Sequence, residues 1–226
     1  MVYSDSSFKI QFPPVEMADS DGLLAIGGNL RSETLLEAYR NGVFPWTVCP
    51  ITWWSPDPRA VFELEGFRLS RRMERLYRQK KFSYSIDQNF SEVISGCAES
   101  KPGRESTWIS PEFIDAYTRL HREGVAHSCE VWQGQELVGG IYGVAIGGFF
   151  AAESMFYRES NASSMGLRFF LDYLLKAGFE LFDSQVITPH TRKLGAVEIS
   201  RTIYMERLQR ALEKKCFIEK IKKSQG

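Results

Sequence analysis

The stretch 137-LVGGIYGVAIGGFFAAESMF-156 decides the fold of this chain. It contains two apolar runs, Leu137 to Ile146 and Phe149 to Phe156, which are joined by Gly147-Gly148. Adjacent glycines tolerate the positive φ angles that a tight hairpin turn requires. The stretch therefore predicts two long antiparallel strands.

A helix and another strand follow this hairpin along the chain. The helix is expected from about Ala162 to Ala177, with Asn161 as its capping residue and Gly178 closing it. The apolar run from Phe179 to Val186 then predicts a buried strand. Because strands joined through a helix are usually parallel, we expect this strand to run parallel to the one that ends at Phe156.

The rest of the chain alternates helix and strand signals. These predict helices over 32–41, 68–81 and 111–123 and from near Arg201, and strands near 60–64 and over 127–132. This order indicates an α+β or α/β chain with a mixed sheet. The first 60 residues hold six of the nine prolines and three of the five tryptophans. We therefore expect a small, loop-rich α+β N-terminal domain over residues 1–60 and the mixed sheet in residues 61–226.

Length, composition and charge exclude several classes of protein. With 226 residues, 43% of them hydrophobic and 25% charged, the chain is typical of a soluble globular protein. Its apolar runs are all shorter than the roughly 18 residues of a membrane span, and its start lacks a secretory signal, so we expect a cytoplasmic protein. Twenty-eight basic residues balance 28 acidic ones, so attraction to a polyanion must come from local clustering.

The cysteine and histidine patterns do not favour a metal site. The four cysteines are far apart and form no CxxC pair, so we interpret them as reduced thiols: Cys49, Cys97, Cys129 and Cys216. The three histidines, His121, His127 and His190, lack a zinc-ligand spacing. The chain also lacks phosphate-loop glycine motifs and a GxSxG elbow, and nothing marks a nucleophile for His190 to serve.

A cluster of basic residues lies in the helix predicted over 68–81. Its members are Arg68, Arg71, Arg72, Arg75, Arg78, Lys80 and Lys81. The arginines recur at helical spacings and share one face, opposite a stripe of Leu69, Met73 and Leu76. Two interpretations remain open, a solvated surface helix and a face that binds phosphates.

Two acidic residues lie in strands that are otherwise apolar. Asp183 and Gln185 are two residues apart and so project from the same face of a strand, and Glu153 interrupts the run Phe149 to Phe156. An unpaired buried charge is costly, so each carboxylate needs partners. Asp183 is either a structural residue, satisfied by backbone amides or an arginine, or part of a polar pair at the floor of a cleft. Glu153 is likewise either a salt-bridge partner or a site residue.

Two tryptophans in predicted loops are either core residues or part of a binding surface. Trp46 follows Phe44-Pro45, and Trp108 follows Thr107 after a polar stretch. Tryptophans are usually core residues, but a rigid indole in a loop also offers a surface on which a nucleic-acid base stacks.

Several motifs, in order along the chain, together indicate a family. They are DGLLAIGGNL (21–30), GVFPW (42–46), WWSPDPR (53–59), Thr107-Trp108-Ile109 within 103–110, LVGGIYGV (137–144), ESMF (153–156) with Asn161-Ala162-Ser163, and Asp183-Ser184-Gln185. With these motifs the chain resembles the bacterial leucyl/phenylalanyl-tRNA–protein transferase family over most of residues 12–205.

The resemblance implies an activity, a fold and partners. Members transfer Leu or Phe, and less readily Met, from aminoacyl-tRNA to the α-amino group of a protein that begins with Arg or Lys. The new N-terminal residue marks that protein for degradation by the N-end rule pathway. The larger domain would be similar to the GNAT acyltransferase fold, with no metal or coenzyme and no membrane partner. Because no heptad or amphipathic stripe demands a dimer, we expect a monomer.

The resemblance also implies site residues. Asp183 and Gln185 would be catalytic. Either Asp183 polarises the Gln185 amide, which draws the proton from the attacking amine, or Asp183 only orients Gln185, which positions the amine while the leaving 3′ oxygen takes the proton. The residues matched near the aminoacyl-adenosine are Tyr39, Trp46, Trp108 and Glu153, with the two tryptophans holding the adenosine.

An apolar pocket is implied for the Leu or Phe side chain. Its matched residues are Ile141, Phe150, Leu167, Phe170, Leu174 and Phe182. Such a pocket rejects β-branched and polar side chains by shape and desolvation. The cluster of basic residues would then contact the acceptor stem of the tRNA without reading its bases.

Two other functions remain open. A GNAT-type acetyltransferase that uses acetyl-coenzyme A would carry a glycine-rich pyrophosphate loop before its long helix, whereas residues 157–164 contain no glycine. A non-catalytic RNA-binding module would suit the basic cluster and the tryptophans, but it leaves Asp183 and Gln185 without a purpose. The variant Asp183→Ala separates enzyme from module, because an enzyme would keep tRNA binding and lose transfer.

Overall fold

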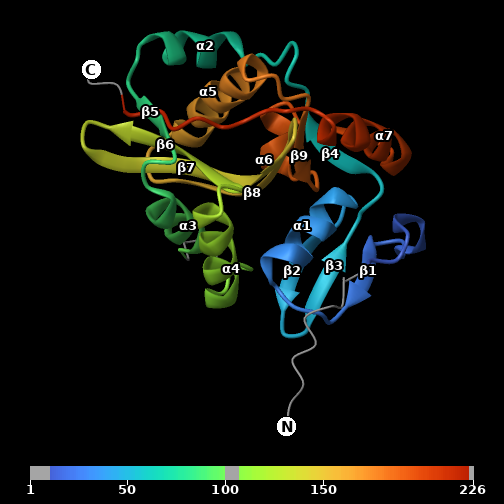
Figure 1. Ribbon diagram of the computed structural model, residues 1–226. Helices are drawn as coiled ribbons and strands as arrows, with labels where there is room; N and C mark the ends of the chain where they lie inside the picture. Colours follow the sequence, from blue (N-terminus) through green and yellow to red (C-terminus); the bar gives the residue numbers. More distant parts are fainter. Residues whose placement is uncertain (1–10, 100–106, 224–226) are drawn as a thin grey trace.

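The computed structural model describes residues 11–99 and 107–223, so residues 103–106 of the Trp108 motif lie outside the described part (Figure 1). A seven-stranded sheet contains β4 (Arg59–Phe62), β5 (Ser83–Ile86), β6 (Ala126–Gln133), β7 (Glu136–Ile146), β8 (Phe149–Tyr157), β9 (Leu181–Gln185) and β10 (Val197–Ile199). Their order across the sheet is β10-β4-β9-β8-β7-β6-β5. The predicted α+β class with a mixed sheet is confirmed, because β8 and β9 pair in parallel while the other neighbours are antiparallel.

The hairpin predicted from residues 137–156 forms β7 and β8. Gly147 adopts φ +60°, and a Cβ atom there would lie 2.7 Å from backbone oxygens at the end of α7 (Arg201–Leu212). The Gly148 N–H donates to the Ala211 carbonyl oxygen (2.7 Å). The glycine pair therefore permits the close approach of the C-terminal helix as well as the turn.

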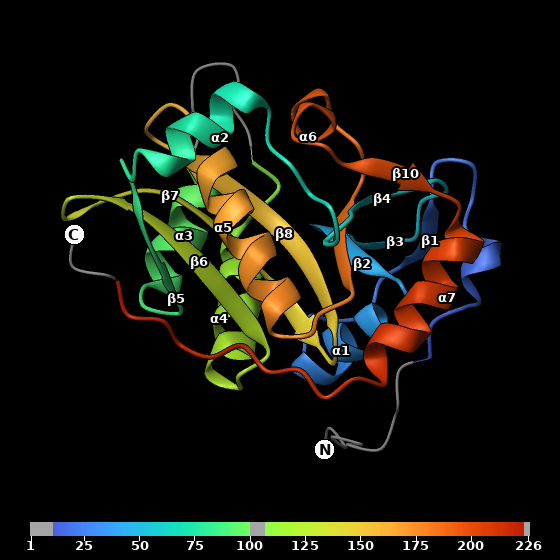
Figure 2. The same ribbon diagram turned by 90° about the horizontal axis from the view of Figure 1, so that it is seen from above.

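Helices cover both faces of the large sheet (Figures 1 and 2). α3 (Phe90–Ala98) and α4 (Pro111–Arg122) lie on one face of the sheet. α5 (Ala162–Lys176) and α2 (Arg71–Arg78) lie on the opposite side. Each side has its own buried apolar cluster. Because α5 connects β8 to β9, the strand returns in the predicted parallel direction. None of the described helices combines the length and the apolarity of a bilayer-spanning segment.

A smaller sheet precedes the large one in the chain. It contains β1 (Leu23–Ile26), β2 (Phe44–Val48) and β3 (Ile51–Trp54) in the order β1-β3-β2, with α1 (Ser32–Arg40) between β1 and β2. The sequence predicted α1 and an α+β composition for this part, but it did not locate the three strands. The three strands are four or five residues long, and Pro45 lies in β2, an edge strand where a proline is tolerated. Short strands of this kind leave a weak pattern in the sequence.

The structure corrects two predicted helix ends. α2 begins after Ser70, whose hydroxyl accepts the Met73 N–H, and ends before Lys80, which is left-handed (φ +52°). Arg68, Lys80 and Lys81 therefore lie outside the helix. Asn161 precedes α5 as predicted, but it adopts φ +70° and its side chain makes no capping hydrogen bond. The elements that the sequence did not predict also include η1 (Val15–Met17), β5, α3, α6 (Pro189–Lys193) and β10.

Candidate active site

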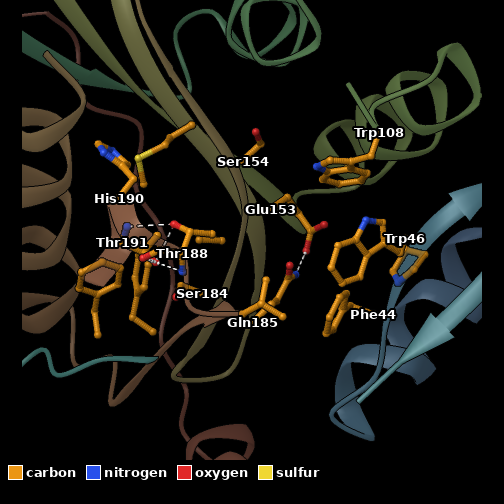
Figure 3. Close-up of a pocket in the computed structure, with 16 residues that line it drawn as sticks. Phe44, Trp46, Trp108, Glu153, Ser154, Ser184, Gln185, Thr188, His190 and Thr191 are labelled. Atoms are coloured by element: carbon orange, nitrogen blue, oxygen red, sulfur yellow. Dashed lines mark hydrogen bonds between the residues drawn. The ribbon is translucent and has the colours of Figure 1, made fainter. Parts of the chain in front are cut away.

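A cavity of about 350 Å³ opens where the large sheet faces β2 of the small sheet (Figure 3). β2 contributes Phe44, Pro45 and Trp46, and the segment before α4 contributes Trp108. The remaining lining residues are Phe62, Ala152, Glu153, Ser154, Met155, Phe182, Ser184, Gln185, Val186, Thr188, His190 and Thr191. Aromatic and aliphatic side chains with a few polar groups among them are typical of a binding cavity.

Two bulges in neighbouring strands shape this cavity. In β8, Glu153 is an extra residue between its paired neighbours. In β9, Ser184 is an extra residue between Asp183 and Gln185. Bulges bend a strand and change the direction of its side chains, and they are frequent beside active sites. The consecutive residues 152–155 consequently all line the cavity, although side chains of a regular strand alternate between its faces.

Glu153 is buried in the wall of the cavity, with only 7% of its surface exposed. Its Oε1 accepts hydrogen bonds from Tyr39 Oη (2.8 Å) and Gln185 Nε2 (2.7 Å), and its Oε2 accepts one from Tyr117 Oη (2.8 Å). Burial raises the pKa of Glu153 to about 7, although these hydrogen bonds lower it, and the nearby charge of Asp183 adds to the increase. The carboxyl group therefore titrates near neutral pH.

Gln185 adopts a left-handed backbone conformation, with φ +66°. Its backbone N–H donates to Asp183 Oδ1 (2.8 Å), which stabilises this uncommon conformation. Its side-chain amide donates to Glu153, as the dashed line in Figure 3 marks. Because an ionised carboxylate only accepts hydrogen bonds, Nε2 must face Glu153 and Oε1 is turned away from it.

Asp183 has no exposed surface and lies outside the cavity lining. Its Oδ1 accepts from Arg59 Nε (3.0 Å), and its Oδ2 accepts from Arg59 Nη2 (2.7 Å) and Tyr204 Oη (2.9 Å). Burial lowers the pKa of Arg59, but the charges of Asp183, Tyr204 and Glu153 and the hydrogen bonds to Asp183 together outweigh burial and hold that pKa above its ordinary value. These contacts correspond to the structural interpretation, in which an arginine and a backbone amide satisfy Asp183.

Trp46 and Trp108 both line the cavity, as Figure 3 shows. Trp46 is 37% exposed, and its ring lies 5.2 Å from that of Trp54. Trp108 is half-buried, and its ring lies 5.1 Å from that of Phe113. Each indole therefore packs against another aromatic ring and still borders the cavity.

The six predicted pocket residues belong to one buried cluster: Ile141, Phe150, Leu167, Phe170, Leu174 and Phe182. Phe182 lines the cavity and stacks on Phe150, with ring centroids 5.3 Å apart. The other five have no exposed surface and do not line the cavity. Beside Phe182 the lining contains Phe62 and Met155, which were not among the predicted pocket residues. Tyr39 is also absent from the lining, because it is buried behind Glu153.

The seven basic residues of the cluster are all exposed, and none of them lines the cavity. Four of them lie on α2, whose Met73 and Leu76 pack against the apolar cluster under α5, so the predicted division of this helix into two faces is confirmed. Lys81 pairs with Glu159 (2.9 Å) at the surface. The basic cluster is therefore a surface distinct from the cavity.

Sequence reasoning missed the partners of the polar residues. Arg59 stands at the end of the WWSPDPR motif, but no pattern links it to Asp183, 124 residues further on. Tyr117 and Tyr204 occupy helix positions that are equally typical of ordinary core residues. Only the apolar surroundings of Asp183 and Glu153 indicated that such partners exist.

The chain matches known proteins over most of its length. The model of the family "Leucyl/phenylalanyl-tRNA protein transferase" matches residues 61–209, and the model of the N-terminal domain of that transferase matches residues 28–57. A leucyl/phenylalanyl-tRNA–protein transferase of Shewanella sp. (strain W3-18-1) is 48% identical over 208 residues, which cover 90% of this chain and 88% of that protein. The transferase of Syntrophobacter fumaroxidans (strain DSM 10017 / MPOB) is 49% identical over 197 residues, 86% of this chain and 84% of that protein. The resemblance inferred from the motifs is thus confirmed, and the chain belongs to the leucyl/phenylalanyl-tRNA protein transferase family.

Proposed function

We propose that this chain transfers Leu or Phe, and less readily Met, from aminoacyl-tRNA to the N-terminal α-amino group of proteins that begin with Arg or Lys. In the cytoplasm, this aminoacyltransferase would mark those proteins for degradation by the N-end rule pathway, acting as a monomer without a metal or coenzyme. The observation that carries the proposal is the cavity, whose lining contains Gln185 and Glu153 together with two tryptophans and the apolar Phe182.

The chemistry of the transfer suits these residues. The aminoacyl ester is already reactive, and an α-amine has a pKa of about 7.7–8.0, so part of it is neutral near pH 7. Holding that amine against the ester carbonyl supplies much of the acceleration. Gln185 is suited to this task, because its Oε1 is turned away from Glu153 and accepts a hydrogen bond from the amine. Asp183 acts behind it by holding the Gln185 backbone, which agrees with the account in which Asp183 only orients Gln185.

The aminoacyl-adenosine end of the tRNA would occupy the rest of the cavity. We propose that Trp46 and Trp108 stack on the terminal adenine, a contact that contributes about 1–3 kcal/mol per base. Phe182, with Phe62 and Met155, would border the Leu or Phe side chain. The buried residues behind Phe182, from Ile141 to Leu174, then fix its position rather than touch the substrate.

Two further parts of the chain would support binding. The basic cluster from Arg68 to Lys81 would contact phosphates of the acceptor stem, which explains how a chain with no net charge binds RNA. We also propose that residues 1–60 and 61–226 form two domains that supply opposite walls of the cavity while sharing one apolar core. The support for this division is that β2 supplies one wall, whereas β8 and β9 supply the other.

A transfer assay tests the proposal directly. Radiolabelled Leu, Phe, Met and Val on charged tRNA are offered with a peptide that begins with Arg. We expect transfer of Leu and Phe, weaker transfer of Met and none of Val, because an apolar pocket excludes a β-branched side chain by shape. A folded chain that transfers none of the four would refute the proposed activity.

The variant Gln185→Asn tests the role of the Gln185 side chain in the same assay. Asparagine tolerates the left-handed conformation of residue 185, so the fold should survive. Its side chain is shorter, so its amide loses the position between Glu153 and the cavity. We expect transfer to fall roughly 100-fold while circular dichroism and tRNA affinity stay unchanged.

A further inference from the structure

We propose that Glu153 is the general base of the transfer, taking a proton from the attacking amine and returning it to the leaving 3′ oxygen. This inference rests on the proposed function and assigns its proton transfer to one side chain. The reasons are the position of Glu153 in the cavity wall, the number of hydrogen bonds that each buried carboxylate accepts, and the charges around it.

Glu153 lines the cavity beside Gln185, whereas Asp183 does not line it. A carboxylate has about four acceptor positions. Asp183 fills four, with two hydrogen bonds from Arg59, one from Tyr204 and one from the Gln185 backbone. Within the described part of the chain Glu153 accepts three, and Oε2 accepts only that from Tyr117. Glu153 therefore keeps one acceptor position for a proton donor in the cavity.

The electrostatic surroundings of Glu153 favour a group that exchanges protons near neutral pH. Titratable and charged groups face it from every element packed against it: Tyr39 on α1, Arg59 on β4, Tyr117 on α4, Tyr142 on β7 and Asp183 on β9. Burial raises the pKa of Glu153 to about 7, whereas Asp183 is tied to a buried arginine. A general base is most efficient when its pKa lies near the working pH.

The reaction balances with Glu153 in this role. The neutral amine nitrogen forms a bond to the ester carbonyl carbon, and one N–H proton moves to the Glu153 carboxylate. The bond between that carbon and the 3′ oxygen of the adenosine then breaks. The leaving oxygen takes the proton from Glu153, so the products are an amide and a free 3′-hydroxyl. Glu153 returns to its ionised form, and Gln185 holds the amine throughout.

The first test is the variant Glu153→Gln in single-turnover transfer of Phe to an Arg-peptide. Glutamine is isosteric. Its Oε1 still accepts hydrogen bonds from Tyr39 and Gln185, and its Nε2 donates to the Tyr117 hydroxyl oxygen, but the amide does not take a proton. General-base catalysis contributes about 10²–10⁴-fold, so we expect the rate to fall at least 100-fold. Binding of a non-hydrolysable phenylalanyl-adenosine should stay unchanged. A rate within a few-fold of the wild-type rate would overturn the proposal.

The second test follows the pH dependence of the same rate. The wild-type rate should fall as pH drops and Glu153 becomes protonated. Tyr117→Phe removes a hydrogen bond that favours the ionised form of Glu153, so the acidic limb of the pH–rate profile should move to higher pH. The titration of the acceptor amine is the same for both proteins, so the shift reports the protein group.

His190→Gln is the control for the second test, because His190 is the other titratable side chain in the described lining. We expect it to leave the acidic limb where it is. A limb that stays in place with Tyr117→Phe, or moves with His190→Gln, would overturn the proposal for Glu153 while wild-type transfer still stands. A wild-type chain that transfers no Phe would instead overturn the proposed function and this inference with it.

Discussion

Arg59 and Asp183 form an ion pair in which both side chains are almost fully buried. The Arg59 guanidinium also lies over the rings of Phe44 (4.7 Å) and Tyr204 (4.5 Å). Such a pair stabilises the fold only while both partners are present, because removing one leaves a buried charge without a partner or water. The pair therefore supports β4, β9 and the Gln185 backbone together.

We expect Asp183→Ala to lower the free energy of unfolding by roughly 3–5 kcal/mol. Urea unfolding followed by circular dichroism measures this loss. Because the variant weakens the fold, lost transfer would report unfolding as well as chemistry, so Gln185→Asn is the sharper test of the site. In the control Glu63→Ala, a partly exposed pair with Arg207 is removed, and we expect a loss of about 1 kcal/mol or less. Equal losses in the two variants would contradict the assigned role of the buried pair.

At the residue scale, the sequence predicted several residues that line the cavity but not the contacts that they make. Glu153, Gln185, Trp46 and Trp108 were all predicted site residues, and all line the cavity. The hydrogen bonds from Tyr39 and Tyr117 to Glu153 could not be predicted, because both tyrosines come from helices that are distant from Glu153 in the sequence. A single sequence carries no signal for such long-range pairs.

At the scale of elements, the longest elements gave the strongest patterns. The β7–β8 hairpin and α5 are long and are bordered by glycines, so their patterns are strong. β1 and β10 have four and three residues, too few for a periodic pattern. The bulges in β8 and β9 each add one residue to a strand without changing its composition, so the sequence predicted the strands but not the cavity that the bulges shape.

The basic face of α2 makes a prediction about tRNA binding. Arg71, Arg75 and Arg78 are exposed on this helix, and each phosphate contact contributes about one unit to the slope of log affinity against log salt. We expect replacing all three by glutamine to weaken tRNA binding and to reduce that slope by up to about three. Filter binding over a range of salt concentrations measures both.

The control for the α2 variant is Arg122→Gln, which removes an exposed arginine of α4. It should leave the salt dependence of binding unchanged. If the triple variant keeps the wild-type slope, the basic face of α2 is a solvated helix surface and the tRNA binds elsewhere.

At the scale of the whole molecule, the two sheets share one apolar core. Leu35 and Tyr39 of α1 lie in the same buried cluster as Phe113 and Tyr117 of α4 and Tyr204 of α7. This cluster crosses the boundary that composition suggested at residue 60. Composition reports loop content, not which side chains pack together, so a change in composition does not by itself delimit an independent core. The hydrogen bond from Tyr39 to Glu153 crosses the same boundary.

We therefore expect both sheets to unfold in one cooperative transition. Native-state hydrogen exchange in increasing denaturant should give the protected amides of β3 and β7 the same free energy of opening. A chain that begins at residue 59 loses α1 and exposes the cluster around Phe113, so it should show no cooperative unfolding. A lower opening energy for β3, or cooperative unfolding of the shortened chain, would mean that the small sheet folds separately. If the energies coincide, the carboxyl group of Glu153 acquires its buried environment only when both sheets are folded. A substitution in the shared core, on the side of either sheet, would then change transfer through the same carboxyl group.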